Sequence, residues 1–169
     1  MRANSVAFLT LLGLSAVACR DTAKEPLVGT FNMGERAQVG PLIYTVFDTK
    51  WAISLGEQPA PRIPANRFLI LNLSIVNGGS QASNIPTFSL VDDAGQVYQE
   101  LDNGEGVTNW IGVVRRVRPA DSVQGTIVFD VPQKQFKLRV SDEDERYALV
   151  NIPLTLGEAP VDVTPGLPK

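Results

Sequence analysis

Few residues of this chain have the chemistry of a catalytic group, because its 169 residues include no histidine and one cysteine, Cys19. A Ser/His/Asp triad, a Cys/His pair and a histidine metal site are therefore excluded. Carboxylate pairs remain as candidates for acid and base catalysis, notably Asp92 with Asp93 and Asp102 with Glu105. Acidic residues in turns more often face solvent and shape the turn. We therefore expect a protein that is not an enzyme and that has no cofactor.

Two acidic loops could supply oxygen ligands to a metal ion. One is the run from Asp142 to Glu145, and the other contains Asp102 and Glu105. Calcium binds carboxylate oxygens of this kind, and Asp142, Asp144, Asp102 and Glu105 are the candidate ligands. Neither loop has the spacing of acidic residues and glycine that is typical of a calcium-binding loop. We interpret both as solvated hairpin tips, with a calcium-binding or carboxylate-dependent enzymatic protein as the alternative.

A basic and aromatic group stands out in a chain whose net charge is −3. Its members are Trp110, Arg115, Arg116 and Arg118. Such a patch could bind an anionic polymer of the cell envelope, lipid headgroups or another envelope protein. Arginines beside a strand can instead protect a sheet edge from aggregation, so both interpretations remain open. We expect no nucleic-acid partner, because the chain has no extended basic stripe.

The N-terminus predicts export. Arg2 precedes an apolar run from Val6 to Leu14, which is about half as long as the roughly 20 residues that span a bilayer. Small residues follow this run, so residues 1–18 are predicted to be a cleaved signal peptide and not a transmembrane helix.

The end of the predicted signal peptide carries a lipidation motif. Ala16-Val17-Ala18-Cys19 resembles the lipobox of bacterial lipoproteins, in which the cysteine is diacylated and becomes the first residue. The acyl chains would hold the protein at a membrane. The alternative is that Cys19 is an ordinary cysteine of a secretory signal or a free thiol. Arg20 stands where retention in the inner membrane typically uses Asp, which favours the outer membrane, at its periplasmic or surface face.

The composition fits one compact domain with tails, since 44% of the residues are apolar and 20% are charged. Residues 19–36 are predicted to form the lipidated cysteine and a polar tether, in which Val28 and Phe31 could still dock on the domain. The folded domain is predicted at residues 37–156. Residues 157–169 are rich in proline and are predicted to form a mobile tail.

Alternating hydrophobic residues predict that the domain consists of strands. In the clearest one, from Phe68 to Val76, every second residue from Leu69 to Ile75 is apolar. Because Phe68 and Ile70 make part of its other face apolar, we expect a central strand with that face partly covered. Further strands are predicted at residues 37–39, 42–53, 87–91, 96–98, 122–131, 136–140 and 147–152, and residues 101–119 form either a strand or an irregular connection.

The strands are separated by turns rich in glycine and proline, and no segment has the periodicity of an amphipathic helix. About seven to nine short strands of this kind predict an all-β, immunoglobulin-like, antiparallel two-sheet sandwich. The hairpin loop from Asp92 to Gly95 is predicted to place Gly95 in the left-handed conformation.

The order of these strands and turns resembles a known bacterial family. The positions that carry the resemblance are Gly40, Val76-Asn77-Gly78, Phe88, Leu90, Asp92 to Gly95, Tyr98, Pro119, Gly125 and Phe129 to Pro132. Over residues 37–141 the chain resembles the bacterial lipoprotein domain of unknown function 4352, a family similar to the immunoglobulin-like fold of a secreted immunoprotective antigen. The family often has Pro-Gly where this chain has Pro119-Ala120. The resemblance implies a fold and provides no catalytic residues.

These observations predict a membrane-anchored envelope lipoprotein whose non-catalytic β-sandwich binds a partner or serves as a scaffold, with a specific role that the sequence does not identify. A role as an accessory in the assembly or stress response of other envelope proteins would differ only in the partner.

Overall fold

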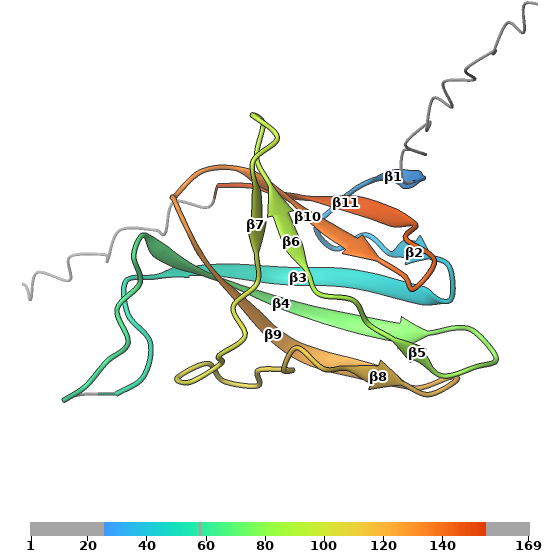
Figure 1. The fold of residues 1–169 in the computed structure, drawn as a ribbon, viewed down its shortest axis with the longest axis horizontal. Coiled ribbons are helices and arrows are strands. Elements are labelled where there is room, and N and C mark those ends of the chain that lie inside the picture. Colours follow the sequence, from blue (N-terminus) through green and yellow to red (C-terminus); the bar gives the residue numbers. More distant parts are fainter. Residues whose placement is uncertain (1–25, 58, 155–169) are drawn as a thin grey trace, which may run out of the picture.

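In the computed structural model, residues 26–57 and 59–154 are described, and they form a sandwich of two β-sheets (Figure 1). The two main sheets have five and four strands, and β5 (Ser83–Asn84) pairs with β8 (Arg116–Val117) in a further two-stranded sheet. The described residues include no helix, and thus no helical segment that could cross a membrane. The all-β sandwich expected from the sequence is confirmed.

The five-stranded sheet has the strand order β1-β11-β10-β6-β7. Its strands are β1 (Leu27–Asn32), β6 (Ser89–Val91), β7 (Val97–Gln99), β10 (Phe136–Ser141) and β11 (Tyr147–Ile152). Neighbouring strands are antiparallel except for β1 and β11, which are parallel. The turn between β6 and β7 places Gly95 at a φ of 79°, as the hairpin sequence predicts.

The four-stranded sheet has the strand order β2-β3-β4-β9. Its strands are β2 (Ala37–Val39), β3 (Leu42–Ala52), β4 (Arg67–Asn77) and β9 (Ser122–Val131). Strand β4 lies between β3 and β9, which confirms that it is central. A bulge in β3 at Phe47 shifts the register between β3 and β4.

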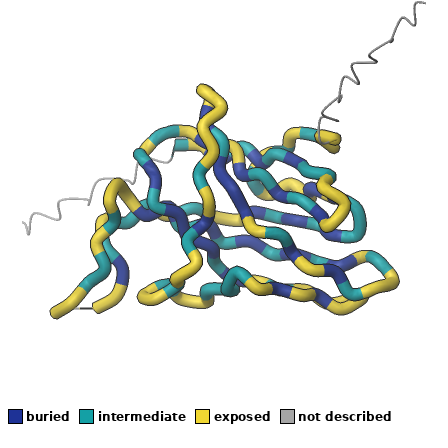
Figure 2. The backbone as a smooth tube through the Cα atoms, viewed as in Figure 1, coloured by how far each residue is buried: buried dark blue, intermediate teal, exposed yellow. Residues whose placement is uncertain are grey.

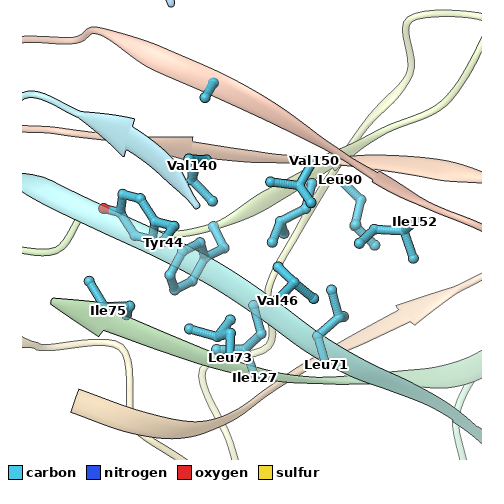
Figure 3. Packing of buried hydrophobic residues seen from close by; sticks show 14 of the residues in the cluster. Tyr44, Val46, Leu71, Leu73, Ile75, Leu90, Ile127, Val140, Val150 and Ile152 are labelled. Atoms are coloured by element: carbon cyan, nitrogen blue, oxygen red, sulfur yellow. The ribbon is translucent and has the colours of Figure 1, made fainter. Parts of the chain in front are cut away.

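Alternate side chains of the two sheets meet in one hydrophobic core (Figure 3). Leu71 of β4 and Phe129 of β9 have no exposed surface, and Leu71, Leu73 and Ile127 point toward Leu90, Val140 and Val150 of the other sheet. The buried positions follow the strands, whereas the turns are exposed (Figure 2). Burying one such side chain stabilises the fold by about 1.5–3 kcal/mol.

A smaller apolar cluster lies on the other face of the four-stranded sheet. Phe68 of β4 and Val128 of β9 are buried there together with Leu55. Leu101 and Val107, from the loop that follows β7, pack against this cluster. The expectation that the second face of β4 is partly covered is therefore confirmed.

The folded domain begins earlier than the sequence suggested. The tether predicted at residues 19–36 contains β1, which pairs along its length with β11 and places Phe31 against the core. The lower boundary of the domain at residue 37 was therefore wrong. Leu27 and Val28 are about half exposed, at 49% and 48%, so the apolar residues of β1 do not form the alternating pattern that predicts a strand. The signal peptide, Cys19 and the tail at residues 157–169 lie outside the described residues.

The segment from residue 101 to 119 is mostly irregular, with a short strand near its end. Residues before β8 run beside β9, where Thr126 N–H donates to Asn109 O at 2.8 Å and Ile111 N–H donates to Thr126 O at 3.1 Å. Gly125 permits this approach, because a Cβ there would overlap Asn109 O. The two alternatives for this segment, a strand or an irregular connection, are thus each correct for part of it.

Candidate functional site

Arg115, one of the four residues of the predicted basic patch, is not on the surface. It is 5% exposed, and its guanidinium forms an ion pair with Glu100, whose side chain is 1% exposed. The guanidinium also lies over the ring of Phe88 at 4.9 Å, and the Phe88 N–H donates to Glu100 Oε1 at 2.8 Å. The prediction that Arg115 belongs to a surface patch was therefore wrong, and the pair fastens the loop after β7 to the start of β6.

The other members of the predicted patch have separate roles. Trp110 is half-buried, and its indole ring packs on Gly104, where a Cβ would overlap the ring. Its indole N–H is buried without a hydrogen-bond partner among the described residues. Arg116 and Arg118 are exposed on either side of Val117 in and after β8. The exposed charge of the predicted patch thus comes from two arginines, not three.

The acidic turn between β10 and β11 directs its first carboxylate inward. Asp142 is 4% exposed, and its Oδ1 accepts the backbone N–H groups of Asp144 at 3.1 Å and Arg146 at 3.0 Å. The Arg146 guanidinium pairs with Asp142 Oδ2 at 2.6 Å and with Asp144 Oδ2 at 2.8 Å. The calcium candidates Asp142 and Asp144 are therefore occupied in stabilising their own turn.

The second acidic loop lies between β7 and β8. Asp102 and Glu105 are exposed there, and the Glu105 N–H donates to Asn103 Oδ1 at 2.8 Å. Arg62 reaches this loop from the β3–β4 connection and donates to Asn103 O at 2.7 Å. Across residues 26–57 and 59–154, no three acidic or cysteine side chains are grouped closely enough to hold a metal ion.

A tyrosine hydroxyl lies beneath the acidic turn. Tyr44 is 1% exposed and donates a hydrogen bond of 2.6 Å to the backbone oxygen of Ser141. Burial raises the pKa of the Tyr44 hydroxyl far above its ordinary value, and the negative charge of Asp142 adds to the shift. The hydroxyl therefore stays protonated at neutral pH and joins the two sheets.

The carboxylate pair Asp92 and Asp93 is split between two environments. Asp92 is 8% exposed, and its Oδ1 accepts two backbone N–H groups of its own hairpin at 2.8 and 3.0 Å. Its Oδ2 pairs with the Lys134 ammonium, which lies over the rings of Tyr98 and Phe136 at 5.3 and 5.7 Å. The hydrogen bond from Lys134 lowers the pKa of Asp92, and the same contact raises the pKa of Lys134. Asp93 is exposed, so the two acids do not face a common site.

A groove of about 370 Å³ lies where β1 and β11 end. Met33, Phe136 and Ile152 contribute to its lining, together with the amides of Asn32 and Asn151. The Asn151 amide donates to Asn32 Oδ1 at 3.0 Å, so these polar groups are paired with each other. The volume would suit a small ligand, but the lining specifies none.

The outer face of the five-stranded sheet is a surface that the sequence analysis did not single out. Its strands contain Lys137 and Arg139, both on the side opposite the core, and no aspartate or glutamate. The guanidinium of Arg139 lies over the ring of Tyr147 at 4.3 Å. The alternation of Lys137 and Arg139 with buried Leu138 and Val140 was the signal that could have revealed this face.

A family model and several solved structures match the part of this chain that forms the sandwich. The family model described as Domain of unknown function (DUF4352) matches residues 31–152, which confirms the resemblance seen in the strand and turn residues. No match was found among curated proteins.

Several solved structures share the fold. The yjhA protein from Bacillus subtilis has a TM-score of 0.58 at 17% identity, covering 72% of this chain and 98% of that chain. A lipoprotein candidate from the same organism, ycdA, has a TM-score of 0.56 at 15% identity, covering 70% of this chain and 38% of that chain. The secreted protein MPT63 from Mycobacterium tuberculosis has a TM-score of 0.53 at 16% identity, covering 73% of this chain and 96% of that chain. At these identities the likeness concerns the fold alone.

Proposed function

We propose that this chain is a lipid-anchored envelope protein whose β-sandwich binds a partner or serves as a scaffold and catalyses no reaction. The chain belongs to the family described as Domain of unknown function (DUF4352). The anchor is Cys19. The favoured location is the outer membrane, at its periplasmic or surface face, because Arg20 replaces the aspartate that is typical of inner-membrane retention.

The observation that carries this proposal is the short distance along the chain between Cys19 and the sandwich. Strand β1 begins at Leu27, so the connection from Cys19 can extend over at most about 25–30 Å. A lipid on Cys19 would therefore hold the whole domain next to the bilayer. The similarity of the fold to a lipoprotein candidate and to a secreted protein supports export of this chain.

The environment of the charged groups supports a non-catalytic role. Three of the buried charged residues, Glu100, Arg115 and Asp142, are committed to ion pairs that stabilise loops and turns. A catalytic acid or base needs access to a substrate in a cleft. The partners of these three residues lie within the fold instead.

Membrane fractionation tests the anchor. The full chain and its Cys19→Ala variant would be expressed in a bacterium with two membranes, and Ser15→Ala would serve as a control within the signal peptide. We expect the wild type and Ser15→Ala in the membrane fraction and the processed Cys19→Ala protein in the soluble envelope fraction. If the Cys19→Ala variant stays with the membranes after processing, the proposed anchor is wrong.

A further inference from the structure

The chain contains two Asn-Gly pairs, Asn77-Gly78 and Asn103-Gly104, and the structure places them in opposite environments. An asparagine that precedes glycine can deamidate without an enzyme, because no side chain shields the glycine nitrogen from the side-chain amide. Asn77 has no exposed surface, whereas Asn103 is exposed in the loop between β7 and β8. Water and base therefore reach the second pair and not the first.

Hydrogen bonds hold both reacting groups of the first pair. The Gly78 N–H donates to Pro41 O at 2.8 Å, and Asn77 Nδ2 donates to two carbonyl oxygens within the fold. Asn77 Oδ1 accepts the Gly79 N–H at 2.8 Å. The Gly78 nitrogen could attack the amide of Asn77 only after these contacts break, so the first pair is an internal reference for a protected site.

The reacting groups of the second pair are free. Among the residues that the structure describes, neither the Gly104 N–H nor Asn103 Nδ2 has a hydrogen-bond partner. Asn103 Oδ1 accepts the Glu105 N–H at 2.8 Å, which folds the Asn103 side chain back along Gly104. The amide and the nitrogen that would attack it are thus held in one short loop, and no second reactant has to diffuse to the site.

Two contacts of this loop favour the attack further. Arg62 Nη1 donates at 2.7 Å to Asn103 O, the carbonyl oxygen of the peptide bond whose nitrogen belongs to Gly104. When this nitrogen loses its proton, its charge spreads onto that oxygen, so a guanidinium there favours the ionised form. The Glu105 N–H stabilises the negative charge that develops on Asn103 Oδ1 during the attack.

We propose that Asn103 is a site of spontaneous deamidation. The Gly104 nitrogen loses its proton to base and attacks Cγ of Asn103, and the side-chain nitrogen takes up a proton and leaves as ammonia. Water then opens the resulting succinimide ring at either of its two carbonyls, which gives aspartate or isoaspartate. Water is the co-reactant, and no electrons are transferred. This inference goes beyond the proposed function and does not depend on a lipid at Cys19.

Isoaspartate at position 103 changes the loop through its main chain. It adds a carbon atom to the backbone before Gly104 and a negative charge beside Asp102 and Glu105. Gly104 packs so closely on Trp110 that an added Cβ would lie 2.0 Å from Cδ2 of the indole ring. The lengthened main chain must therefore displace Trp110, which pairs with Thr126 of β9.

Peptide mapping by mass spectrometry tests the site. Purified protein carrying Cys19→Ala, which cannot be acylated, would be incubated at neutral and at mildly alkaline pH. We expect Asn103 to convert to aspartate and isoaspartate, and to do so faster at the higher pH. Asn77 should convert at least about 100-fold more slowly, because its buried hydrogen bonds must break first. An Asn103 that stays intact, or equal rates at Asn77 and Asn103, would overturn the proposal.

Arg62→Met tests the assistance by the guanidinium. Loss of a charge-assisted hydrogen bond to the ionising peptide group should slow the deamidation of Asn103 about tenfold. Arg67→Met removes the same charge from an exposed position at the start of β4 and is the matched control. An unchanged or faster rate in Arg62→Met, or equal slowing in both variants, would contradict the role of Arg62 in the mechanism.

Tryptophan fluorescence tests the structural consequence. Protein with isoaspartate at position 103 should emit at a longer wavelength than fresh protein, because Trp110 becomes more exposed to water. Asn103→Asp has the new charge without the extra backbone carbon and should keep the emission of the wild type. Trp51 packs against the main core and contributes equally to all samples. An unshifted emission from the isoaspartate form would overturn the predicted displacement of Trp110.

Discussion

Asn77 shows how much of this fold depends on one buried polar side chain. It has no exposed surface, and its side-chain amide donates to Gln81 O at 2.7 Å and Val117 O at 3.0 Å. Its Oδ1 accepts the Gly79 N–H at 2.8 Å. A single amide therefore joins the end of β4 to the turn that follows it and to β8.

Replacing Asn77 with Ala should lower the free energy of unfolding by about 3 kcal/mol, because the two carbonyls and the N–H group lose a buried partner. Urea unfolding at neutral pH measures this change. Asn72→Ala, at a half-buried position on the outer face of the same strand, should change stability by less than about 1 kcal/mol. Similar losses in the two variants would contradict the role given to Asn77.

Ala120 occupies a backbone conformation that favours glycine. Its φ is 59°, in a turn where the Asp121 N–H donates to Arg118 O at 3.2 Å. The chain thus keeps a left-handed residue after Pro119, at the position where the family often has Pro-Gly. Because alanine is strained in this region, Ala120→Gly should raise the free energy of unfolding by about 0.5 kcal/mol.

Gly95→Ala provides the opposite test. Gly95 has a φ of 79° and no neighbouring atom within 4 Å of an added Cβ, so only the backbone conformation is affected. This variant should lose about 1 kcal/mol. Thermal or urea unfolding compares the two, and a gain in stability for Gly95→Ala, or a loss for Ala120→Gly, would contradict the strain argument.

At the scale of single residues, the sequence predicted which position needs a left-handed backbone conformation better than it predicted which charged side chains are buried. Gly95 was identified because a short hairpin with Asp-Asp-Ala-Gly needs a left-handed residue. The location of Arg115 was predicted wrongly because its burial depends on Glu100, which lies 15 residues earlier, and on Phe88, which lies before the β6–β7 hairpin. Two opposite charges that far apart in a sequence carry no pattern that distinguishes a buried pair from two solvated side chains.

At the scale of elements, the pair between Glu100 and Arg115 fixes the loop after β7 to the sandwich. Arg115→Met should lower the free energy of unfolding by about 3–5 kcal/mol, because it leaves the Glu100 carboxylate buried without its partner. The double variant Glu100→Gln/Arg115→Met should be more stable than Arg115→Met, since glutamine is neutral and can still accept the Phe88 N–H. A double-mutant cycle in urea measures the coupling, and additive losses would contradict it.

The contact between Asp92 and Lys134 joins the β6–β7 hairpin to the β9–β10 turn and should depend on pH. The pKa of Asp92 is lowered from 3.8, so this contact contributes fully above pH 3.8 and is lost as pH falls through the lowered value. The pKa of Lys134 is raised from 10.5, so the contribution is fully present below pH 10.5 and is lost as pH rises through the raised value.

Lys134→Met tests this dependence, because it removes the ammonium that pairs with Asp92 and keeps an unbranched side chain beside the rings of Tyr98 and Phe136. The variant should have a lower urea midpoint than the wild type at neutral pH, and the difference should shrink as the pH falls below 3.8. A difference that stays constant into acid would show that the charge of Asp92 is not involved.

The strands themselves were largely predictable, and the exceptions have physical causes. Strands β4 and β9 alternate apolar and polar residues, β11 is mostly apolar, and turn residues delimit all three, so their predicted bounds agree with the structure to within one residue. Strand β1 was missed because it pairs in parallel with β11 from the opposite end of the chain. Its two exposed apolar residues also hid the alternation on which the sequence analysis depended.

At the scale of the whole molecule, the proposed anchor at Cys19 would precede an edge strand of the five-stranded sheet. The chain enters at β1, on the edge of the sheet whose outer face carries Lys137 and Arg139. The alternation within β10 indicates the exposed side of that strand, but the whole face could not be recognised from the sequence, because the five strands of this sheet come from three distant parts of the chain. Once they are assembled, the absence of acidic residues from these strands becomes a property of one surface.

The central claim is that this sandwich is held at a membrane through Cys19, and mass spectrometry of the protein isolated from bacterial membranes tests it most directly. The account predicts a chain that begins at Cys19 and carries the mass of a diacylglyceryl group on that residue, with or without a further acyl chain. A chain that retains residues 1–18, or one that begins at an unmodified Cys19, would contradict it.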